Sequence, residues 1–240
     1  MSYVFIRLKQ GKVEGLLGKY FTWQGENPPE EVTEDMIKCT RIDENIDFTW
    51  WDKPAESVPA EYFGVEWTGY LIVPVEGTYR FYVLSDDGSK FWLDEELLID
   101  AWKDQAPTVY HSPLVELAAG YHRLRYLFYN RHPYAVVKLG WIKPNGESEI
   151  IPPENFATPT GDEIRVEGLP DGYRIELWSG GKIKETIVKT GIAIIDARDL
   201  ETPIDGYFKV YNDKGELVYE SPIIRDIWGG DAYKIAKSGE

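Results

Sequence analysis

Alternation of apolar and polar residues runs along most of this chain and predicts strands almost throughout. The predicted strands are rich in β-branched and aromatic residues and are bounded by Gly, Pro, Asn or Asp. Before residue 150 they are Tyr3–Leu8, Val65–Val73, Gly77–Ser85, Lys90–Leu93, Leu97–Ile99, Tyr121–Tyr129 and Ala135–Ile142. Only Pro29–Lys38, with its proline start and early acidic residues, predicts a short helix. The pattern therefore indicates an all-β fold.

A break in the pattern at Ile151–Asp162, where Pro, Thr and Gly gather, predicts a domain boundary. Short strands resume after it, over a length typical of a small Ig-like or prealbumin-like β-sandwich. The expected organisation is an N-terminal strand or arm at 1–14, a β domain at 15–156, a small β-sandwich at 163–225 and a C-terminal tail at 226–240. The tail carries Trp228 and Tyr233, which suit either a mobile end or an anchor on a partner.

The most informative motif is Asp86-Asp87-Gly88, between two predicted strands. Asp-Gly between alternating apolar runs predicts a β-hairpin turn. Neighbouring side chains of an ordinary strand point to opposite faces, so two adjacent carboxylates grip one ion only if the backbone bends between them. A cis peptide bond between Asp86 and Asp87 would supply such a bend. The motif is therefore either a plain turn or a cradle for a cation.

Charge and composition narrow the classes of partner. With 26 basic and 41 acidic residues the net charge is −15, which argues against a nucleic-acid partner because phosphates demand a basic surface, so none is expected. It also disfavours anionic membranes, and it fits a soluble surface, calcium affinity or a basic partner. Cys39 is the only cysteine, so no intrachain disulfide is possible. Only nine Asn and Gln residues beside abundant Lys and Glu favour a thermophilic source.

Targeting signals are not visible in the sequence. The first twenty residues lack the apolar core of a signal peptide, and no run approaches the length of a transmembrane helix, so membrane insertion is not expected. Either a leader has been removed or the protein is assembled inside a cell. The expected location is accordingly an extracellular surface or a virion.

Five blocks, in a fixed order, carry a family resemblance. They are Gly15–Phe21 (GLLGKYF), Ile46–Trp50 (IDFTW), Val65–Trp102, Ala118–Asn130 (AAGYHRLRYLFYN) and Leu139–Phe156. Together they resemble the protective-antigen (PA-14) domain family over about residues 15–156. The resemblance implies a β-barrel-like or sandwich module of mostly antiparallel strands, and it does not extend to the C-terminal sandwich.

The resemblance also implies a site. In the sugar-binding members two successive aspartates joined by a cis peptide bond hold a calcium ion, and an asparagine from a later loop adds a ligand. Asp86, Asp87 and Asn130 match these positions, and carboxylate and amide oxygens are ligands that calcium prefers. The loop after Asn130, RHPY, departs from the lectin pattern. Residues implied at the rim, where a sugar binds, are Trp92, Tyr129, His132 and Tyr134.

Other chemistry finds little support. His111, His122 and His132 have no spacing suited to zinc, and no phosphate loop or Ser-His-Asp arrangement is present, so no enzyme is expected. Of Trp50 and Trp51, one indole is expected in the core and the other facing out.

Two functions follow from these patterns. The first is a non-catalytic recognition or adhesion protein that binds a cell-surface glycan with the help of calcium. The second is a structural, decoration or attachment subunit of a virus particle, phage tail or surface filament. In that case the N-terminal strand and the C-terminal tail join neighbouring subunits in a homo- or hetero-oligomer. An accessory domain split from a glycosidase or protease is a third and weaker interpretation.

Overall fold

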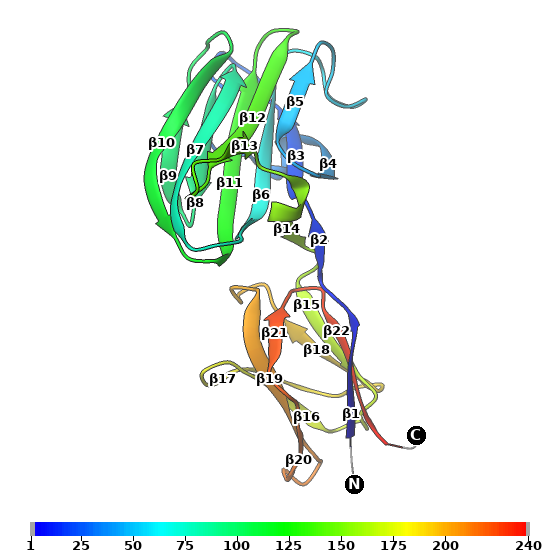
Figure 1. Cartoon of the computed structure of the whole chain (residues 1–240). Coiled ribbons are helices and arrows are strands. Elements are labelled where there is room, and N and C mark those ends of the chain that lie inside the picture. Colours follow the sequence, from blue (N-terminus) through cyan, green and yellow to red (C-terminus); the bar gives the residue numbers. More distant parts are fainter. Residues whose placement is uncertain (1–2, 239–240) are drawn as a thin grey trace. The chain divides into compact units, whose positions relative to one another are not determined.

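A computed structural model describes residues 3–238, and strands account for nearly all of its regular structure. Figure 1 shows the strands along the whole chain. The predicted all-β fold is confirmed. The chain divides into two compact units: unit 1 comprises Met1–Val13 with Pro159–Glu240, and unit 2 comprises Glu14–Thr158. Within the described residues, no helix has the length and apolar character needed to cross a membrane.

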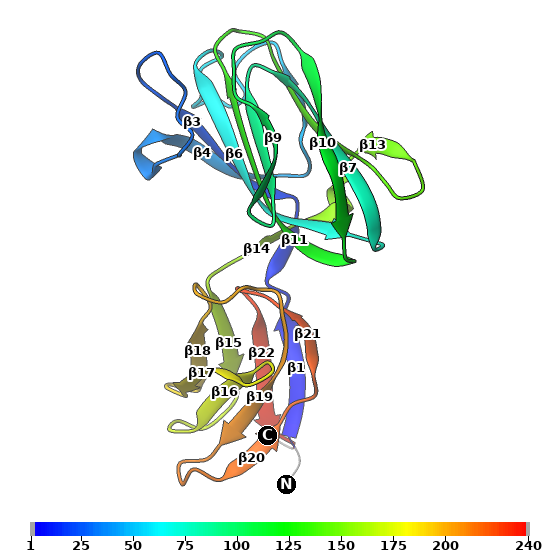
Figure 2. The same ribbon diagram turned by 90° about the vertical axis from the view of Figure 1, so that its left-hand side faces the viewer.

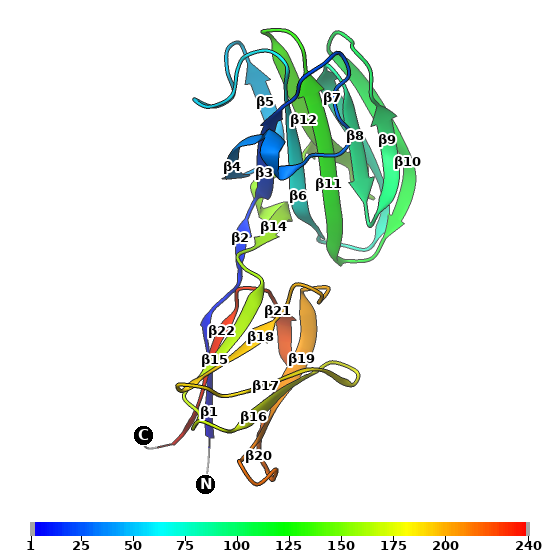
Figure 3. The same cartoon turned by 180° about the vertical axis from the view of Figure 1, so that it is seen from behind.

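Unit 2 is built from two sheets. One has the order β10-β7-β12-β13 with β5 paired to β12, and the other has the order β2-β14-β6-β11-β8-β9 with β3 paired to β6 and β4 to β3. Figure 1 shows the first sheet in front, and Figure 3, from behind, shows the second. The elements are β2 (Lys12–Glu14), β3 (Leu16–Thr22), η1 (Glu34–Met36), β4 (Ile37–Asp43), β5 (Asp47–Trp50), β6 (Phe63–Val73), β7 (Gly77–Asp86), β8 (Ser89–Leu93), β9 (Glu96–Ala101), β10 (Thr108–Leu117), β11 (Gly120–Asn130), β12 (Ala135–Ile142), β13 (Ser148–Ile150), η2 (Pro153–Asn155) and β14 (Phe156–Pro159).

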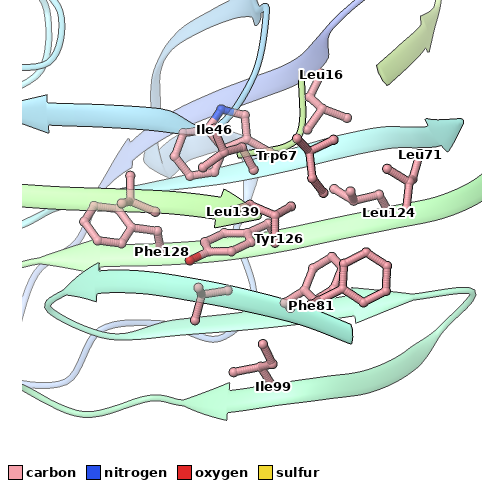
Figure 4. Packing of buried hydrophobic residues seen from close by; sticks show 14 of the residues in the cluster. Leu16, Ile46, Trp67, Leu71, Phe81, Ile99, Leu124, Tyr126, Phe128 and Leu139 are labelled. Atoms are coloured by element: carbon pink, nitrogen blue, oxygen red, sulfur yellow. The ribbon is translucent and has the colours of Figure 1, made fainter. Parts of the chain in front are cut away.

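Aromatic side chains fill the space between these two sheets. In β7 the alternation places Phe81 inside, fully buried, while its neighbour Arg80 is exposed. Figure 4 shows Phe81 in the same cluster as Trp67, Tyr126 and Phe128. Burying each such side chain contributes about 1.5–3 kcal/mol. The period-two pattern in the sequence is therefore the pattern of core contacts.

The predicted hairpin at Asp86-Asp87-Gly88 is wrong. β7 pairs with β10 and β12, whereas β8 pairs with β11 and β9. The chain therefore crosses from one sheet to the other at Asp87 and Gly88. Alternating strands on either side of a short link are equally compatible with a hairpin and with a crossover, because the pattern records only which face is buried.

Two further expectations in unit 2 need correction. Pro29–Lys38 forms no α-helix: a single 3₁₀ turn, Glu34–Met36, leads directly into β4. So short a segment gains too few hydrogen bonds to offset helix nucleation. Strand β10 was not expected, because its pattern is interrupted around Pro113, where the register shifts between His111 and Leu114.

Unit 1 is a small β-sandwich, as expected. One sheet has the order β1-β22-β15-β18, and the other has the order β17-β16-β19-β20 with β21 paired to β19. Figure 2 shows β18, β15, β22 and β1 next to one another. The strands are β1 (Tyr3–Lys9), β15 (Glu163–Glu167), β16 (Arg174–Trp178), β17 (Lys182–Ile187), β18 (Ile192–Asp196), β19 (Ile204–Tyr211), β20 (Leu217–Glu220), β21 (Ile224–Ile227) and β22 (Ala232–Lys237).

The N-terminal arm and the C-terminal tail are not separate segments. β1 and β22 form an antiparallel pair, and Trp228 and Tyr233 have no exposed surface. The expectation of a free arm and tail is thus wrong for the described residues; residues 1–2 and 239–240 lie outside them. Pairing between the two ends of the chain leaves no local sequence signal, because it depends on residues more than 200 positions apart.

Asp231 links the two ends of the chain. Its carboxylate, with no exposed surface, accepts hydrogen bonds from Arg7 Nη2 at 2.5 Å, from the Trp228 backbone N–H at 3.1 Å, from the Gly11 backbone N–H and from the Tyr233 hydroxyl. A buried carboxylate with a charged partner and several donors holds these groups together, and its removal takes away the acceptor that they share.

We predict that Asp231→Ala lowers the free energy of unfolding of unit 1 by about 3 kcal/mol, because breaking a buried ion pair leaves the other charge uncompensated. Equilibrium urea denaturation followed by tryptophan fluorescence measures the change. Asp213→Ala, at an exposed turn position, is the matched control and should have little effect. Equal stability of the two variants would contradict this role of Asp231.

Candidate functional site

The crossover between the two sheets of unit 2 carries the acidic pair. Asp86 ends β7, and the peptide bond between Asp86 and Asp87 is cis, as expected. Gly88 follows because nothing larger fits: a Cβ there would lie 2.2 Å from the Tyr129 ring. Asp87 N–H donates to the Tyr129 carbonyl at 3.2 Å, and Tyr129 N–H donates to the Gly88 carbonyl at 3.0 Å. The crossover is therefore attached to the end of β11.

The Asp87 carboxylate joins this crossover to two loops. It is buried, with 2% of its surface exposed. Oδ1 accepts the backbone N–H of Gln105 at 3.0 Å, and Oδ2 accepts the backbone N–H of Arg131 at 2.9 Å. Each carboxylate oxygen has accepted a single hydrogen bond, so each keeps capacity for a further ligand.

The Gln105 side chain uses both ends of its amide group to hold the loop beside Asp87. Its side-chain amide donates to the Asp87 carbonyl at 3.0 Å and to Ser85 Oγ at 3.2 Å, and its Oε1 accepts the Tyr110 hydroxyl at 2.6 Å. The loop between β9 and β10 is therefore fixed beside the acidic pair by both backbone and side-chain hydrogen bonds.

Asn130 lies beside Asp87, because its two chain neighbours, Tyr129 and Arg131, both bond to the crossover. Its side chain has no exposed surface. Nδ2 donates to the His132 carbonyl, which fixes the amide orientation, and Oδ1 is then buried with no hydrogen-bond donor. A buried carbonyl oxygen without a partner costs free energy unless something else binds it.

Asp86 is half-buried, and its carboxylate forms no hydrogen bond or ion pair with another described residue. Burial raises the pKa of Asp86, the adjacent Asp87 carboxylate raises it further, and nearby His132 opposes both effects. Neither aspartate of the pair has a Lys or Arg partner in the part of the chain that the structure describes. Their negative charge is thus left uncompensated by protein side chains.

These residues fit a hard cation. The unpaired Asn130 oxygen and the free Asp86 carboxylate are oxygen ligands of the kind that calcium binds, and Asp87 has remaining acceptor capacity. Within residues 3–238, no three His, Cys, Asp or Glu side chains gather as a metal cluster. A cation here depends on two carboxylates, one amide and whatever backbone carbonyls or ligand oxygens complete the shell.

Two of the four residues predicted at the rim, His132 and Tyr134, lie at the same end of the sheet as the acidic pair. His132 is exposed and close enough to affect the pKa of Asp86. The Tyr134 ring lies 4.5 Å from the Trp51 ring, between centroids, and Trp51 is 78% exposed. Trp50, as expected, packs in the core, where its ring stacks on Phe48 at 4.8 Å.

The other two predicted rim residues have different environments. Tyr129 is 1% exposed, and its ring is enclosed by Trp102 at 4.6 Å, so its face is not open to a ligand. Trp92 pairs with Arg125, whose guanidinium covers its ring at 4.5 Å. Arg125 is five residues before Asn130 on β11, which is roughly 16 Å along a strand, so Trp92 is not near the acidic pair.

Sequence reasoning missed the residues that position the site. Gln105 and Tyr110 come from a loop and a strand with no motif of their own, and Arg131 contributes only a backbone N–H. A lone polar residue in a loop carries no sequence signal for this role. The sequence did indicate that Trp51 is exposed, because it follows a core tryptophan and adjacent side chains of a strand point to opposite faces.

Comparisons with known proteins match residues 13–155 to the PA14 domain, in agreement with the resemblance over about 15–156. Among curated proteins, the anti-sigma-I factor RsgI3 of Acetivibrio thermocellus is 33% identical over 170 residues, covering 69% of this chain and 25% of that protein. The chain thus spans about a quarter of the length of this relative.

Two solved structures resemble the chain with a TM-score of 0.54. An anti-sigma factor domain-containing protein is 27% identical, and the match covers 82% of this chain and 66% of that one. The PA14 sugar-binding domain from an RTX adhesin is 18% identical, and the match covers 61% of this chain and 99% of that one. At that identity the second likeness concerns the fold alone.

We predict that Asp86→Asn does not destabilise the calcium-free protein at neutral pH. The folded state raises the pKa of Asp86 above its ordinary 3.8, so it favours the protonated form. Stability contributed by Asp86 is therefore present at low pH and lost as pH rises from the ordinary value through the raised one. Asparagine cannot ionise and avoids this loss.

Thermal midpoints of wild type and variant, measured in EDTA from pH 4 to pH 7, test the sign of this difference. Subtracting the two curves removes the titration of all other groups. Glu95→Gln, in the exposed turn between β8 and β9, is the control and should follow wild type. A lower midpoint for Asp86→Asn at pH 7 would mean that the carboxylate is a structural acceptor.

Proposed function

The chain belongs to the PA14 domain family, and on that basis we propose that it is a non-catalytic recognition protein that binds carbohydrate through a calcium ion at Asp86, Asp87 and Asn130. One observation carries the proposal: a buried or half-buried carboxylate pair without a cationic partner lies beside a buried amide oxygen without a donor. Buried charges in proteins are normally paired or bound to metal. The fold is also one that a sugar-binding adhesin domain uses.

The chemistry of the ligands supports calcium over zinc and copper. Calcium takes 6–8 oxygen ligands, whereas zinc and copper favour nitrogen and sulfur. When bound, calcium would supply open coordination positions for hydroxyl groups of a sugar. The protein's own part is to hold Asp87 through the Gln105 and Arg131 backbone N–H groups and to keep the Asn130 amide oriented through the His132 carbonyl.

A second candidate function is that of a ligand-sensing segment in a regulatory protein. The likeness to the anti-sigma factor domain-containing structure covers 82% of this chain, which is more than unit 2 alone supplies. It therefore includes part of unit 1, which lies outside the PA14 match. In such a protein the carbohydrate site would provide the input, and both candidates place the site at an outer cell surface.

The alternative of an assembly subunit has lost one of its supports. It assigned to the N-terminal strand and the C-terminal tail the joining of neighbouring subunits, whereas β1 and β22 pair with each other.

The proposal predicts that the protein, freed of metal with EDTA, binds calcium with one site, and that Asp86→Asn abolishes binding because a carboxylate ligand is lost. Isothermal titration with calcium chloride measures this. Calcium at 100 times its dissociation constant should raise the free energy of unfolding by about 2.7 kcal/mol in wild type only. Glu95→Gln serves as the control and should bind like wild type.

Sugar binding is tested separately on a glycan array, in calcium and in EDTA. Signals in calcium that vanish in EDTA and in Asp86→Asn support carbohydrate recognition. Absence of any heat or stabilisation up to millimolar calcium would sink the proposed site. Calcium binding without a glycan signal would leave a structural metal and no carbohydrate function.

The sensing role predicts that a chimera of the anti-sigma-I factor, carrying this chain in place of its matching segment, changes the output of a sigma-I-dependent reporter when a glycan from the array is added. The Asp86→Asn chimera should lose the response while its basal output stays unchanged. Equal responses of both chimeras would show that the response to the glycan does not depend on this site.

A further inference from the structure

A solvent-exposed indole lies at the same end of the sheet as the acidic pair. Trp51 is 78% exposed, whereas the eight other tryptophans are buried or half-buried. A large apolar ring in water gains free energy when another apolar surface covers it.

The position of this indole is fixed from two sides. Trp50 stacks on Phe48 in the core with an interplanar angle of 10°, so chain alternation directs Trp51 outward. The Tyr134 ring contacts Trp51 at 4.5 Å with an interplanar angle of 55°. The contact with Tyr134 lowers the side-chain entropy that is lost when a ligand binds.

Strand register places the ring next to the proposed cation site. Ala135 pairs with Trp50, and Val136 pairs with Asp86. β12 therefore lies between β5 and β7, as Figure 1 shows. The residue after β5, the residue before β12 and the last residue of β7 lie at the same end of this sheet. The backbones of Trp51 and Asp86 are two strand spacings apart across the sheet and two residues apart along it, which is ~12 Å. That distance exceeds a single sugar ring and suits the next ring of a chain.

We propose that Trp51, backed by Tyr134, is a stacking subsite for a second sugar ring, so that the ligand is a disaccharide or longer chain and not a single monosaccharide. This inference rests on the proposed function. The apolar C–H face of a pyranose packs on the indole while its hydroxyls stay in water. The first ring binds at Asp86, Asp87 and Asn130, and the glycosidic bond spans the gap to Trp51.

The surroundings of Trp51 favour a sugar over a protein partner. Asp52 and Lys53 follow it and are exposed, and Lys53 forms an ion pair with Glu56 at 3.0 Å. Two adjoining aromatic rings beside charged groups lack the broad apolar centre of a protein interface. A narrow platform with polar surroundings matches a ligand whose faces are apolar and whose edges carry hydroxyls.

The experiment compares immobilised monosaccharide and disaccharide pairs: galactose with galactobiose, glucose with cellobiose and xylose with xylobiose. Binding of the full chain is measured in calcium by surface plasmon resonance. We expect wild type to bind at least one disaccharide about tenfold more tightly than its monosaccharide. Trp51→Ala should lose this advantage and keep the monosaccharide affinity and the calcium affinity of wild type.

Trp92→Ala is the matched control, because it removes a half-buried indole remote from the acidic pair, and it should retain the full advantage. Thermal midpoints identify any variant that is misfolded, and Trp51→Phe, which keeps an aromatic face, should retain part of the gain.

If wild type binds calcium but prefers no disaccharide, or if Trp51→Ala binds disaccharides like wild type, the subsite does not exist. A loss of calcium affinity in Trp51→Ala would overturn it in favour of a structural role, and a wild type that binds no calcium would instead remove the proposed function itself.

Discussion

The buried carboxylate of Asp87 is the constraint on which the site depends. Its two oxygens accept backbone N–H groups from two loops that are far apart in sequence, at Gln105 and Arg131. The same residue lies where the chain leaves one sheet of unit 2 and enters the other. One side chain thereby fixes a crossover and the two loops around it, and the flanking residues Asn130 and His132 take their positions from that arrangement.

Comparison with the other buried aspartates explains why this one suggests a ligand. Asp43, Asp87 and Asp231 are the buried aspartates among the described residues. Asp43 has Arg41 as an ionic partner at 2.6 Å, and Asp231 has Arg7 at 2.5 Å. In those two cases the protein compensates the charge itself, and the result is stability. Asp87 has only backbone N–H groups and a second carboxylate nearby, and no Lys or Arg among the described residues pairs with it, which is why this aspartate is the one proposed to bind a cation.

The division of roles within the molecule follows from the same physics. The sheets of unit 2 bury aromatic residues on their inner faces, which gives the strand ends a rigid base. Rigid strand ends can present both a charged group and an exposed ring at fixed spacing, as β5, β12 and β7 do with Trp51, Tyr134 and Asp86. In unit 1 the buried charge of Asp231 instead joins the two ends of the chain, because it pairs with Arg7.

The sequence by itself determined the all-β class and most of the strands around the acidic pair, because these are properties of local alternation. The resemblance of five ordered blocks indicated the family and directed attention to Asp86, Asp87 and Asn130. The sequence did not determine which strands pair. The apparent hairpin at Asp86-Asp87-Gly88 is a crossover, the ends of the chain form one β-ladder, and Tyr129 and Trp92 are covered by Trp102 and Arg125. Alternation says which face of a strand is buried but not against what, so partners, covering groups and the loops that hold Asp87 were decided only by tertiary structure.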